Sequence, residues 1–428
     1  MLSVLLGNYS VYVYHGGAFD AISTDLRLPD MSKLGRHNHA VPVWVHRALL
    51  KDEHRTEDPA TADIFFVPAY LSISKDHQGD ELASHQNRTR DLQHALRNAQ
   101  WYQRCGGCDH LFAGSEVSSG WANDAGYPEV AKVLSNGFIG AFEINRGWVG
   151  SNHWNHERII SIPYLVPGAT SGGAFSPDNR TDVLFFVADS RANAVGWAGC
   201  NRSIMTKLDF LPGVTVDVVH KGQRRWPYRE YKSREKMAVF CPAVCGDTPT
   251  SQRTFDIVTS GCVPLVVGTR LFGKCEPPCH TGWAWEVAGR SHLPFDGLWI
   301  DWSRFPALNE SQLDSASSPD EASLSLKQAL QPLHHRCQHS ARKGSRSGQE
   351  AGLLGLDWAR DPSVCWLRQY IQDTVPNLIY GEGDYRNSSS FGLVARRLVE
   401  SAILRLRGTA MPPVPSFAPS CSPCEASE

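Results

Sequence analysis

With 428 residues the chain is long enough for two domains of ordinary size, and 42% hydrophobic and 10% aromatic residues are typical of a globular protein with sizeable cores. The formal net charge is −2 and no basic stripe is present, so nucleic-acid binding and polybasic membrane binding are not indicated. No apolar stretch approaches the roughly 18 residues of a membrane-spanning helix. A soluble enzyme for a neutral or mildly charged small substrate fits these bounds.

The cysteines and glycosylation sequons favour an oxidising compartment. Eight of the 12 cysteines form close pairs: Cys105/Cys108, Cys241/Cys245, Cys275/Cys279 and Cys421/Cys424. Six Asn-x-Ser/Thr sequons occur, at Asn8, Asn87, Asn179, Asn201, Asn309 and Asn387. Together they indicate a disulfide-bonded glycoprotein of the secretory lumen. Zinc binding through Cys105/Cys108 and Cys275/Cys279 is compatible with the spacing, although no four ligands are spaced as in a zinc motif.

The N-terminal half alternates short apolar strands with helices, as in an α/β domain. Strands are expected over 11–14, 64–67 and 109–112, with a helix over 88–104. His15 follows the first strand, and the carboxyl end of a strand is the usual ligand side of an open α/β sheet. His15 is therefore a candidate site residue; the alternative is a turn histidine without a role.

Two further polar residues lie near expected strand ends. His110 falls inside the strand over 109–112, where a structural hydrogen bond is favoured over a role as a base. Glu116 follows in a loop rich in Gly and Ser, residues 114–120, near where strand ends face a cleft. This position alone makes Glu116 a candidate catalytic base.

The C-terminal half begins after a stretch rich in Gly, Ser and Pro, residues 167–177, which is predicted to be a linker. An apolar run over 183–187 predicts the first strand of a second α/β unit, and the loop after it carries Arg191. The next expected elements are a helix over 202–208, a strand over 214–219 and a helix over 228–237.

Residues 239–267 predict a strand, a loop, a short helix and a second strand, which together form the parallel crossover of an α/β domain. The first strand ends at Pro242. The helix is expected over Gln252–Ser260, with Thr250 or Ser251 as its N-cap. Gly261 ends it at the position that favours glycine, and the second strand follows.

The start of this helix is a candidate site for an anion such as a diphosphate, because a helix N-terminus offers free backbone N–H groups and a positive dipole end. Ser251 adds a hydroxyl and Arg253 a fork-shaped cation. Asp256 lies one turn further on, where its carboxylate could accept hydrogen bonds from ribose hydroxyls. The alternative is that Thr250 only caps the helix, Arg253 is a solvated surface charge and Asp256 balances it.

The same stretch resembles the signature of the exostosin-like glycosyltransferases: a strand ending in Cys-Pro, a Ser-x-Arg helix start, an acidic residue, then Gly-Cys-Val-Pro and a hydrophobic strand. The matching residues are Phe240-Cys241-Pro242, Ser251, Arg253, Asp256 and Gly261-Cys262-Val263-Pro264. The resemblance covers residues 9–305 and is most specific over 180–302. Three features depart from the family. The family tends to have Gly soon after the Cys-Pro pair, whereas here Ala-Val-Cys intervenes before Gly246. Asp256 stands where Glu is usual, with a shorter reach to a ribose, and the loop over 188–191 lacks the usual glycine.

The resemblance implies an α/β protein of the GT-B architecture, with two Rossmann-like domains facing a cleft. It implies an inverting transferase that moves a sugar from a nucleotide-sugar, with a UDP-sugar expected, to a glycan or glycoprotein acceptor. Inversion needs a base for the acceptor hydroxyl, for which Glu116 and His15 are the candidates, and cations and dipoles for the departing diphosphate. The expected donor-binding residues are Ser251, Arg253, Asp256, Arg191 and Thr250.

No Asp-x-Asp run stands in a suitable loop, so no obligatory divalent metal is expected beside the nucleotide-sugar. The expected partners are the donor and the acceptor, with a homo- or hetero-dimer also compatible and no nucleic acid. The family is typically anchored in the Golgi by one N-terminal membrane helix. No such helix is expected from this sequence, which is either a truncated form of an anchored protein or a soluble protein. The expected location is the Golgi or secretory lumen.

Six segments are expected along the chain. They are an N-terminal acceptor-side Rossmann-like domain (1–166), a linker (167–179), a C-terminal nucleotide-sugar-binding domain (180–306), a poorly ordered low-complexity insert (307–355), C-terminal helices that pack back on the first domain (356–410) and a disordered tail (411–428).

Two other functions stay open. Asp256 and the altered loop over 188–191 motivate a catalytically weak sugar- or nucleotide-binding partner subunit on the same scaffold. Binding of UDP without turnover would favour that function over a transferase. A hydrolase would need a nucleophile elbow or a clear carboxylate pair, and neither is visible in the sequence.

Overall fold

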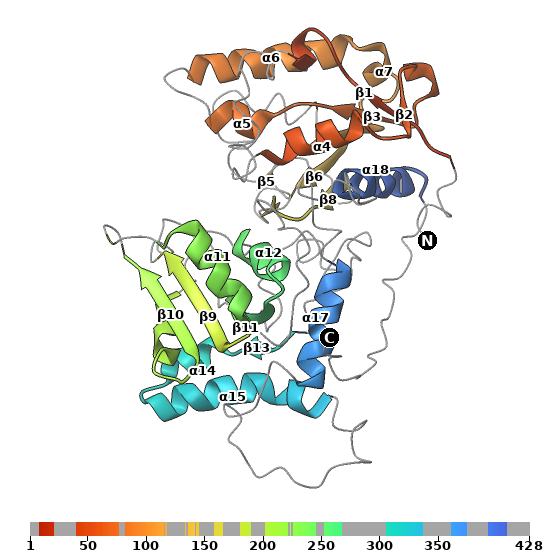
Figure 1. Cartoon of the computed structure of the whole chain (residues 1–428). Helices are drawn as coiled ribbons and strands as arrows, with labels where there is room; N and C mark the ends of the chain where they lie inside the picture. The colour runs from red at the N-terminus through yellow and green to blue at the C-terminus, as the bar shows by residue number, and fades with distance from the viewer. Residues whose placement is uncertain are drawn as a thin grey trace. The chain divides into compact units, whose positions relative to one another are not determined.

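The computed structural model divides the chain into two compact units (Figure 1). The first comprises residues 1–168, 282–299 and 376–415, and the second comprises 169–281, 300–375 and 416–428. The structure describes residues 8–20, 40–76, 82–114, 116–117, 133, 136–141, 143–144, 158–165, 180–189, 202–220, 223, 226–244, 252–267, 305–336, 361–374 and 393–408. The boundary after Gly168 falls inside the segment predicted as a linker.

The first unit is built on a parallel sheet of six strands in the order β2-β1-β3-β4-β6-β8. The strands are β1 (Val11–Val13), β2 (Arg55–Thr56), β3 (Ile64–Val67), β4 (His110–Ala113), β6 (Phe138–Ala141) and β8 (Ile159–Ser161). Every residue of β3, β4 and β6 is buried, as expected of a parallel sheet that is covered on both faces. The chain places β2 on one side of β1 and β3 on the other, so the strand order reverses between β1 and β3.

Short helices connect these strands. They are α4 (Val41–Leu49), the 3-10 turn η2 (Pro59–Thr61), α5 (Leu71–Asp76), α6 (Leu82–Asn98) and α7 (Gln100–Gln103). The predicted apolar side of the helix over 88–104 is confirmed, because Leu92 and Leu96 of α6 are fully buried. A separate two-stranded sheet pairs β5 (Glu116–Val117) with β7 (Glu143–Ile144).

The last helix of the first unit, α18 (Leu393–Leu406), comes from the far end of the chain. Its Arg396 pairs with Asp52 and Glu53, with a 2.9 Å contact to Glu53 Oε1. A Cβ atom added to Gly140 of β6 would lie only 2.8 Å from the side chain of Leu398. Glycine at this position therefore lets α18 lie directly against the sheet.

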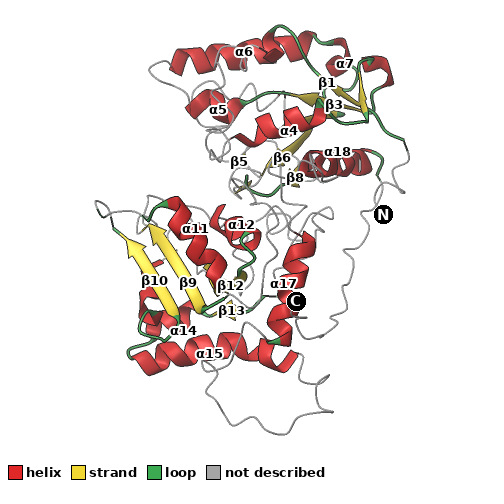
Figure 2. Ribbon diagram, in the orientation of Figure 1, coloured by secondary structure: helices red, strands yellow, loops and turns green. Residues whose placement is uncertain are grey.

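The second unit holds a parallel sheet of five strands in the order β10-β9-β11-β12-β13. The strands are β9 (Asp182–Asp189), β10 (Val214–Val219), β11 (Ala238–Ala243), β12 (Val263–Val267) and β13 (Ala307–Leu308). The helices are η5 (Arg202–Leu208), α11 (Tyr228–Met237), α12 (Gln252–Thr259), α14 (Glu310–Ser315), α15 (Pro319–Arg336) and α17 (Pro362–Thr374) (Figure 2). The strand order reverses between β9 and β11. The predicted α/β class with two Rossmann-like domains is confirmed.

The predicted strand–helix–strand crossover is present as β11, α12 and β12. Gly261 ends α12 at φ +68°, and the backbone N–H groups of Gly261 and Cys262 donate to Val258 and Ile257, which is the Schellman pattern of a helix end. A disulfide joins Cys241 of β11 to Cys262, with their Cα atoms 5.9 Å apart. The crossover is therefore a covalently closed ring.

The segment expected to be a poorly ordered insert, 307–355, is helical in the part that the structure describes. Leu326, Leu330 and Leu333 of α15 are at most 1% exposed and recur at helical spacing, so they form an apolar stripe within a polar composition. The expectation of poor order is therefore wrong for residues 310–315 and 319–336. Of the C-terminal helices expected to pack on the first domain, α18 does so, whereas α17 belongs to the second unit.

Among the described residues, no helix is both long enough and apolar enough to cross a lipid bilayer.

Candidate functional site

The carboxyl edge of the second sheet is the best candidate for a ligand site. In open α/β sheets, ligands bind outside the carboxyl ends of the strands where the strand order reverses, which here is between β9 and β11. The chain segments that leave these two strands carry the predicted donor-binding residues. Of these, Arg191, Thr250 and Ser251 lie outside the described residues. Arg253 and Asp256 lie in α12, the helix that follows β11.

Arg253 occupies the first turn of α12 and rests on aromatic rings from two neighbouring elements. Its guanidinium carbon lies 5.0 Å from the ring centroid of Phe186 on β9 and 5.8 Å from that of Tyr231 on α11. A planar cation stacked in this way keeps its orientation. The guanidinium of Arg253 thus lies beside the positive end of the α12 dipole. A side-chain cation and a helix N-terminus together suit the binding of a phosphate.

Asp256 does not stand alone on the helix surface, because its carboxylate pairs with a lysine of the adjacent helix. The Nζ atom of Lys232 on α11 lies 3.3 Å from Asp256 Oδ1 and 2.7 Å from Glu235 Oε2. The Lys232 and Asp256 side chains are each 15% exposed, and Glu235 is 1% exposed. One ammonium is thus shared by two largely buried carboxylates.

Two hydroxyl groups complete this arrangement, which we call the Lys232 cluster: Tyr231, Lys232, Glu235, Asp256 and Ser260. Tyr231 donates to Glu235 Oε1 at 2.6 Å, and Ser260 also donates to Glu235. Lys232 donates to Ser260 Oγ at 3.1 Å. The cluster therefore ties α11 to the middle and to the C-terminal end of α12, the helix that carries Arg253.

Burial sets the charge states of the Lys232 cluster. Burial and the neighbouring Glu235 together raise the pKa of Asp256 to about 6, against the opposing effect of Lys232. Burial alone would lower the pKa of Lys232, but the two carboxylates raise it above its usual value. The predicted contact of Asp256 with a ribose stays a prediction. The residues that hold Asp256 were missed because their contact depends on how α11 packs beside α12.

The candidate bases lie in the first unit, on different sheets. His15 follows β1 at the carboxyl edge of the six-stranded sheet and is exposed, with its ring 6.0 Å from that of Tyr12. Glu116 begins β5 of the two-stranded sheet, in register with Glu143. His15 and Glu116 are therefore attached to different sheets. Their role as catalytic bases stays a prediction.

His110 has the structural surroundings that its position in a strand predicts. Its side chain is fully buried, with Nε2 2.9 Å from the Tyr14 hydroxyl and Nδ1 2.8 Å from Asp109 Oδ1. Arg104 pairs with the same aspartate. Both ring nitrogens are thus occupied inside the domain.

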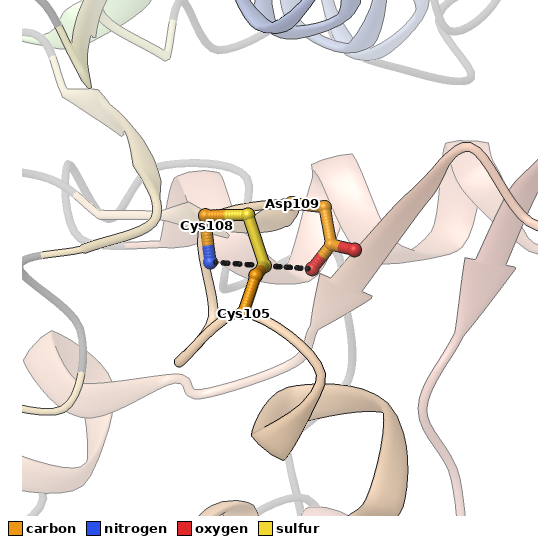
Figure 3. A group of neighbouring side chains, drawn as sticks. All are labelled: Cys105, Cys108 and Asp109. Atoms are coloured by element: carbon orange, nitrogen blue, oxygen red, sulfur yellow. Dashed lines mark hydrogen bonds between the residues drawn. A yellow bond between two sulfur atoms is a disulfide. The ribbon is translucent and has the colours of Figure 1, made fainter.

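Cys105, Cys108 and Asp109 are the described residues that come closest to a metal site, with ligand atoms within 4.8 Å of one another (Figure 3). The two sulfur atoms form a disulfide, however, and Asp109 is bonded to His110 and Arg104. Zinc is bound by thiolates, which a disulfide does not offer. The oxidised turn is therefore not a zinc site, and Cys275 and Cys279 lie outside the described residues.

Comparison with known proteins agrees with this geometry. The model of the exostosin GT47 domain matches residues 7–308. The chain is 24% identical over 224 residues to the probable arabinosyltransferase ARAD1 of Arabidopsis thaliana, covering 51% of this chain and 47% of that protein. It is 26% identical over 284 residues to a probable glucuronoxylan glucuronosyltransferase of the same plant, covering 61% and 57%. The probable β-1,4-xylosyltransferase IRX10, also from A. thaliana, is 23% identical over 245 residues, covering 54% and 57%.

The chain spans about half the length of these curated relatives. The domain match nevertheless covers more than half of the chain and includes the strands and helices of both sheets up to β13. Two parallel sheets in two separate units are the architecture that this family shares. The chain belongs to the exostosin GT47 family of glycosyltransferases, which has the GT-B fold.

Proposed function

We propose that the protein is an inverting glycosyltransferase that moves a sugar from a nucleotide-sugar, with a UDP-sugar as the expected donor, to a glycan or glycoprotein acceptor. The observation that carries the proposal is the position of Arg253, in the first turn of α12 at the strand reversal of the second sheet. Its guanidinium and the helix N-terminus would stabilise the charge that builds on the departing diphosphate. Thr250, Ser251 and Arg191 belong to the same proposal through their places in the sequence.

The donor sugar is proposed from the named relatives. Their names denote arabinosyl, glucuronosyl and xylosyl transfer. The test panel is therefore UDP-arabinose, UDP-glucuronic acid and UDP-xylose, with a GDP-sugar as a comparison. Addition of EDTA tests the expectation that no divalent metal is obligatory. Two disulfides among the described residues support the proposed Golgi or secretory lumen.

The decisive experiment is a thermal-shift titration of the wild-type protein with UDP and GDP, followed by Arg253→Ala. Removal of a charge-assisted contact to phosphate costs about 1.5–3 kcal/mol, so the Kd for UDP should rise about 10- to 100-fold. Arg234→Ala is the matched control: Arg234 pairs with Asp182 at 3.3 Å, at the opposite, amino end of β9. No stabilisation of the wild type by any nucleoside diphosphate would contradict the proposal.

A partner subunit that binds nucleotide but does not catalyse is the second candidate, because Asp256 is held by Lys232. Stabilisation by UDP together with no release of UDP from any donor in the panel would favour it.

A further inference from the structure

The strand reversal of the first sheet, between β1 and β3, carries a polar pair that the sequence did not point to. Tyr70 follows β3 and has φ +38°; among the residues that the structure describes, no other non-glycine residue has a positive φ. A bulky side chain in this region is unfavourable by about 1–3 kcal/mol, and such residues concentrate at functional sites. The Tyr70 side chain is buried, with the residue 3% exposed.

The strained backbone delivers the Tyr70 hydroxyl to His46 of α4. The hydroxyl forms a hydrogen bond with Nδ1 of His46, and the two ring centroids are 5.7 Å apart. The imidazole also stacks over Phe66 of β3, at 5.9 Å between centroids. Because Nδ1 is occupied and the residue is only partly buried, Nε2 is the nitrogen that can meet a ligand; no partner for it lies among the described residues.

An acidic residue on the neighbouring loop acts on both members of the pair. Asp20 accepts a hydrogen bond from the Gly16 backbone N–H at 2.7 Å, in the loop that leaves β1. Burial lowers the pKa of His46 to about 4; Asp20 opposes this shift, while Arg55 and His15 add to it. Burial raises the pKa of Tyr70, and Asp20 raises it further. The imidazole is thus neutral at working pH, with a carboxylate nearby to stabilise its protonated form.

Among the described residues, the space beside Gly16 and Gly17 is open. A Cβ atom added to Gly16 or Gly17 would meet no heavy atom within 4 Å. His15 and Asp20 follow β1, and Tyr70, which is bonded to His46, follows β3. All four residues therefore belong to the carboxyl edge of the sheet, where an open α/β sheet binds its ligand.

We infer that His46, oriented by Tyr70, is the general base that takes the proton of the acceptor hydroxyl; this rests on the proposed transferase function. The proposed role requires the tautomer in which Nδ1–H donates to the Tyr70 oxygen and the lone pair is on Nε2. As the acceptor oxygen bonds to the anomeric carbon, its proton passes to Nε2. The bond from that carbon to the phosphate oxygen breaks, and the diphosphate leaves with the electron pair. Asp20 stabilises the imidazolium until it releases the proton to water.

The test compares His46→Gln with His54→Gln in the full chain, using whichever donor of the panel the wild type turns over. His54 is a matched control because it is also partly buried, with Nδ1 3.0 Å from Asp52 Oδ1, but lies at the amino end of β1. We expect His46→Gln to lower kcat about 10²- to 10⁴-fold, with the KM for donor and the stabilisation by UDP unchanged. His54→Gln should keep the wild-type kcat.

Tyr70→Phe removes only the hydroxyl and so serves where His46→Gln fails to fold. It should lower kcat and move the acid limb of the kcat–pH profile, which a structural role alone would not move. The limb in the wild type should lie near the His46 pKa of about 4, as set by burial, Asp20, Arg55, His15 and Tyr70.

Three outcomes would overturn the inference. A wild-type kcat in His46→Gln with UDP binding intact removes His46 and leaves the proposed function standing. A loss of kcat in His15→Gln or Glu116→Gln, with none in His46→Gln, assigns the base to that residue. A wild type that no nucleoside diphosphate stabilises overturns the proposed function and this inference with it.

Discussion

The two sheets have the same reversal of strand order, yet the side chains beside the two reversals have different chemistry. Beside β9 and β11, the side chains are mostly charged: Arg253 lies on two aromatic rings, and one lysine is shared by two carboxylates. Beside β1 and β3, a histidine and a tyrosine form a neutral hydrogen-bonded pair. The topology of each sheet thus sets where a ligand can bind, and the side chains at that place set which chemical class of ligand fits. The first arrangement suits a diphosphate, and the second suits a hydroxyl.

The largest effect on stability is expected from removal of a charge from the Lys232 cluster. Glu235→Ala would leave Lys232 with one carboxylate and would remove the acceptor for Tyr231 and Ser260. Breaking a buried ion pair costs about 3–5 kcal/mol, and we expect a loss of that size in the unfolding free energy of the second unit. Calorimetry, in which the two units can unfold separately, measures it. Glu230→Ala, an exposed acid in the first turn of the same helix, should change stability little. A mild effect of Glu235→Ala would show that the cluster is dispensable.

An effect of intermediate size on stability is expected from the two disulfides, one in each unit. Cys241 and Cys262 are 21 residues apart, and the loop-entropy relation gives about 3 kcal/mol for closing such a ring. Cys105 and Cys108 are 3 residues apart, for which the same relation gives about 2 kcal/mol. Replacing each pair by alanine should therefore lower the melting temperature of the second unit more than that of the first. Equal losses in calorimetry would indicate that native-state packing, and not chain entropy, sets the effect.

The smallest expected effects concern pH, where the two reversals should respond in opposite directions. The folded-state pKa of Asp256, about 6, is above its usual value of 3.8, so its contribution to stability is present below pH 3.8 and is lost as the pH rises through 6. The folded-state pKa of His46, about 4, is below its usual 6.5, so stability is lost as the pH falls from 6.5 towards 4. Asp256→Asn and His46→Gln should each flatten one of these slopes. Melting curves at half-unit steps of pH measure both, and slopes of the same sign would contradict the comparison.

The features that were predictable from sequence are those that a short stretch encodes by itself. The apolar runs of β3, β11 and β12, and the glycine that ends α12, follow from local pattern and backbone conformation. The place of Arg253 at the start of a helix was predictable because the cap residues and the first turn lie within a few residues of each other in the sequence.

The partners of these residues were not predictable, because they depend on how separate elements pack. Lys232 meets Asp256 across two helices, and Tyr70 meets His46 over 24 residues of chain. Helix α15 was missed for another reason. Its polar average composition hid the stripe formed by Leu326, Leu330 and Leu333.

Helix α18 has a consequence for the order in which the protein matures. Basic residues at its C-terminal end bind other parts of the first unit: Arg405 donates to the Ile159 carbonyl at 2.8 Å, and Arg407, directly after the helix, lies 3.3 Å from Asp63. During synthesis on the ribosome, the first unit cannot complete its fold until this helix has been made. The strands of the second unit, which end at β13, are synthesised before the helix. A stop codon upstream of residue 393 should therefore damage the domain whose sheet was translated earliest, and leave the second sheet intact.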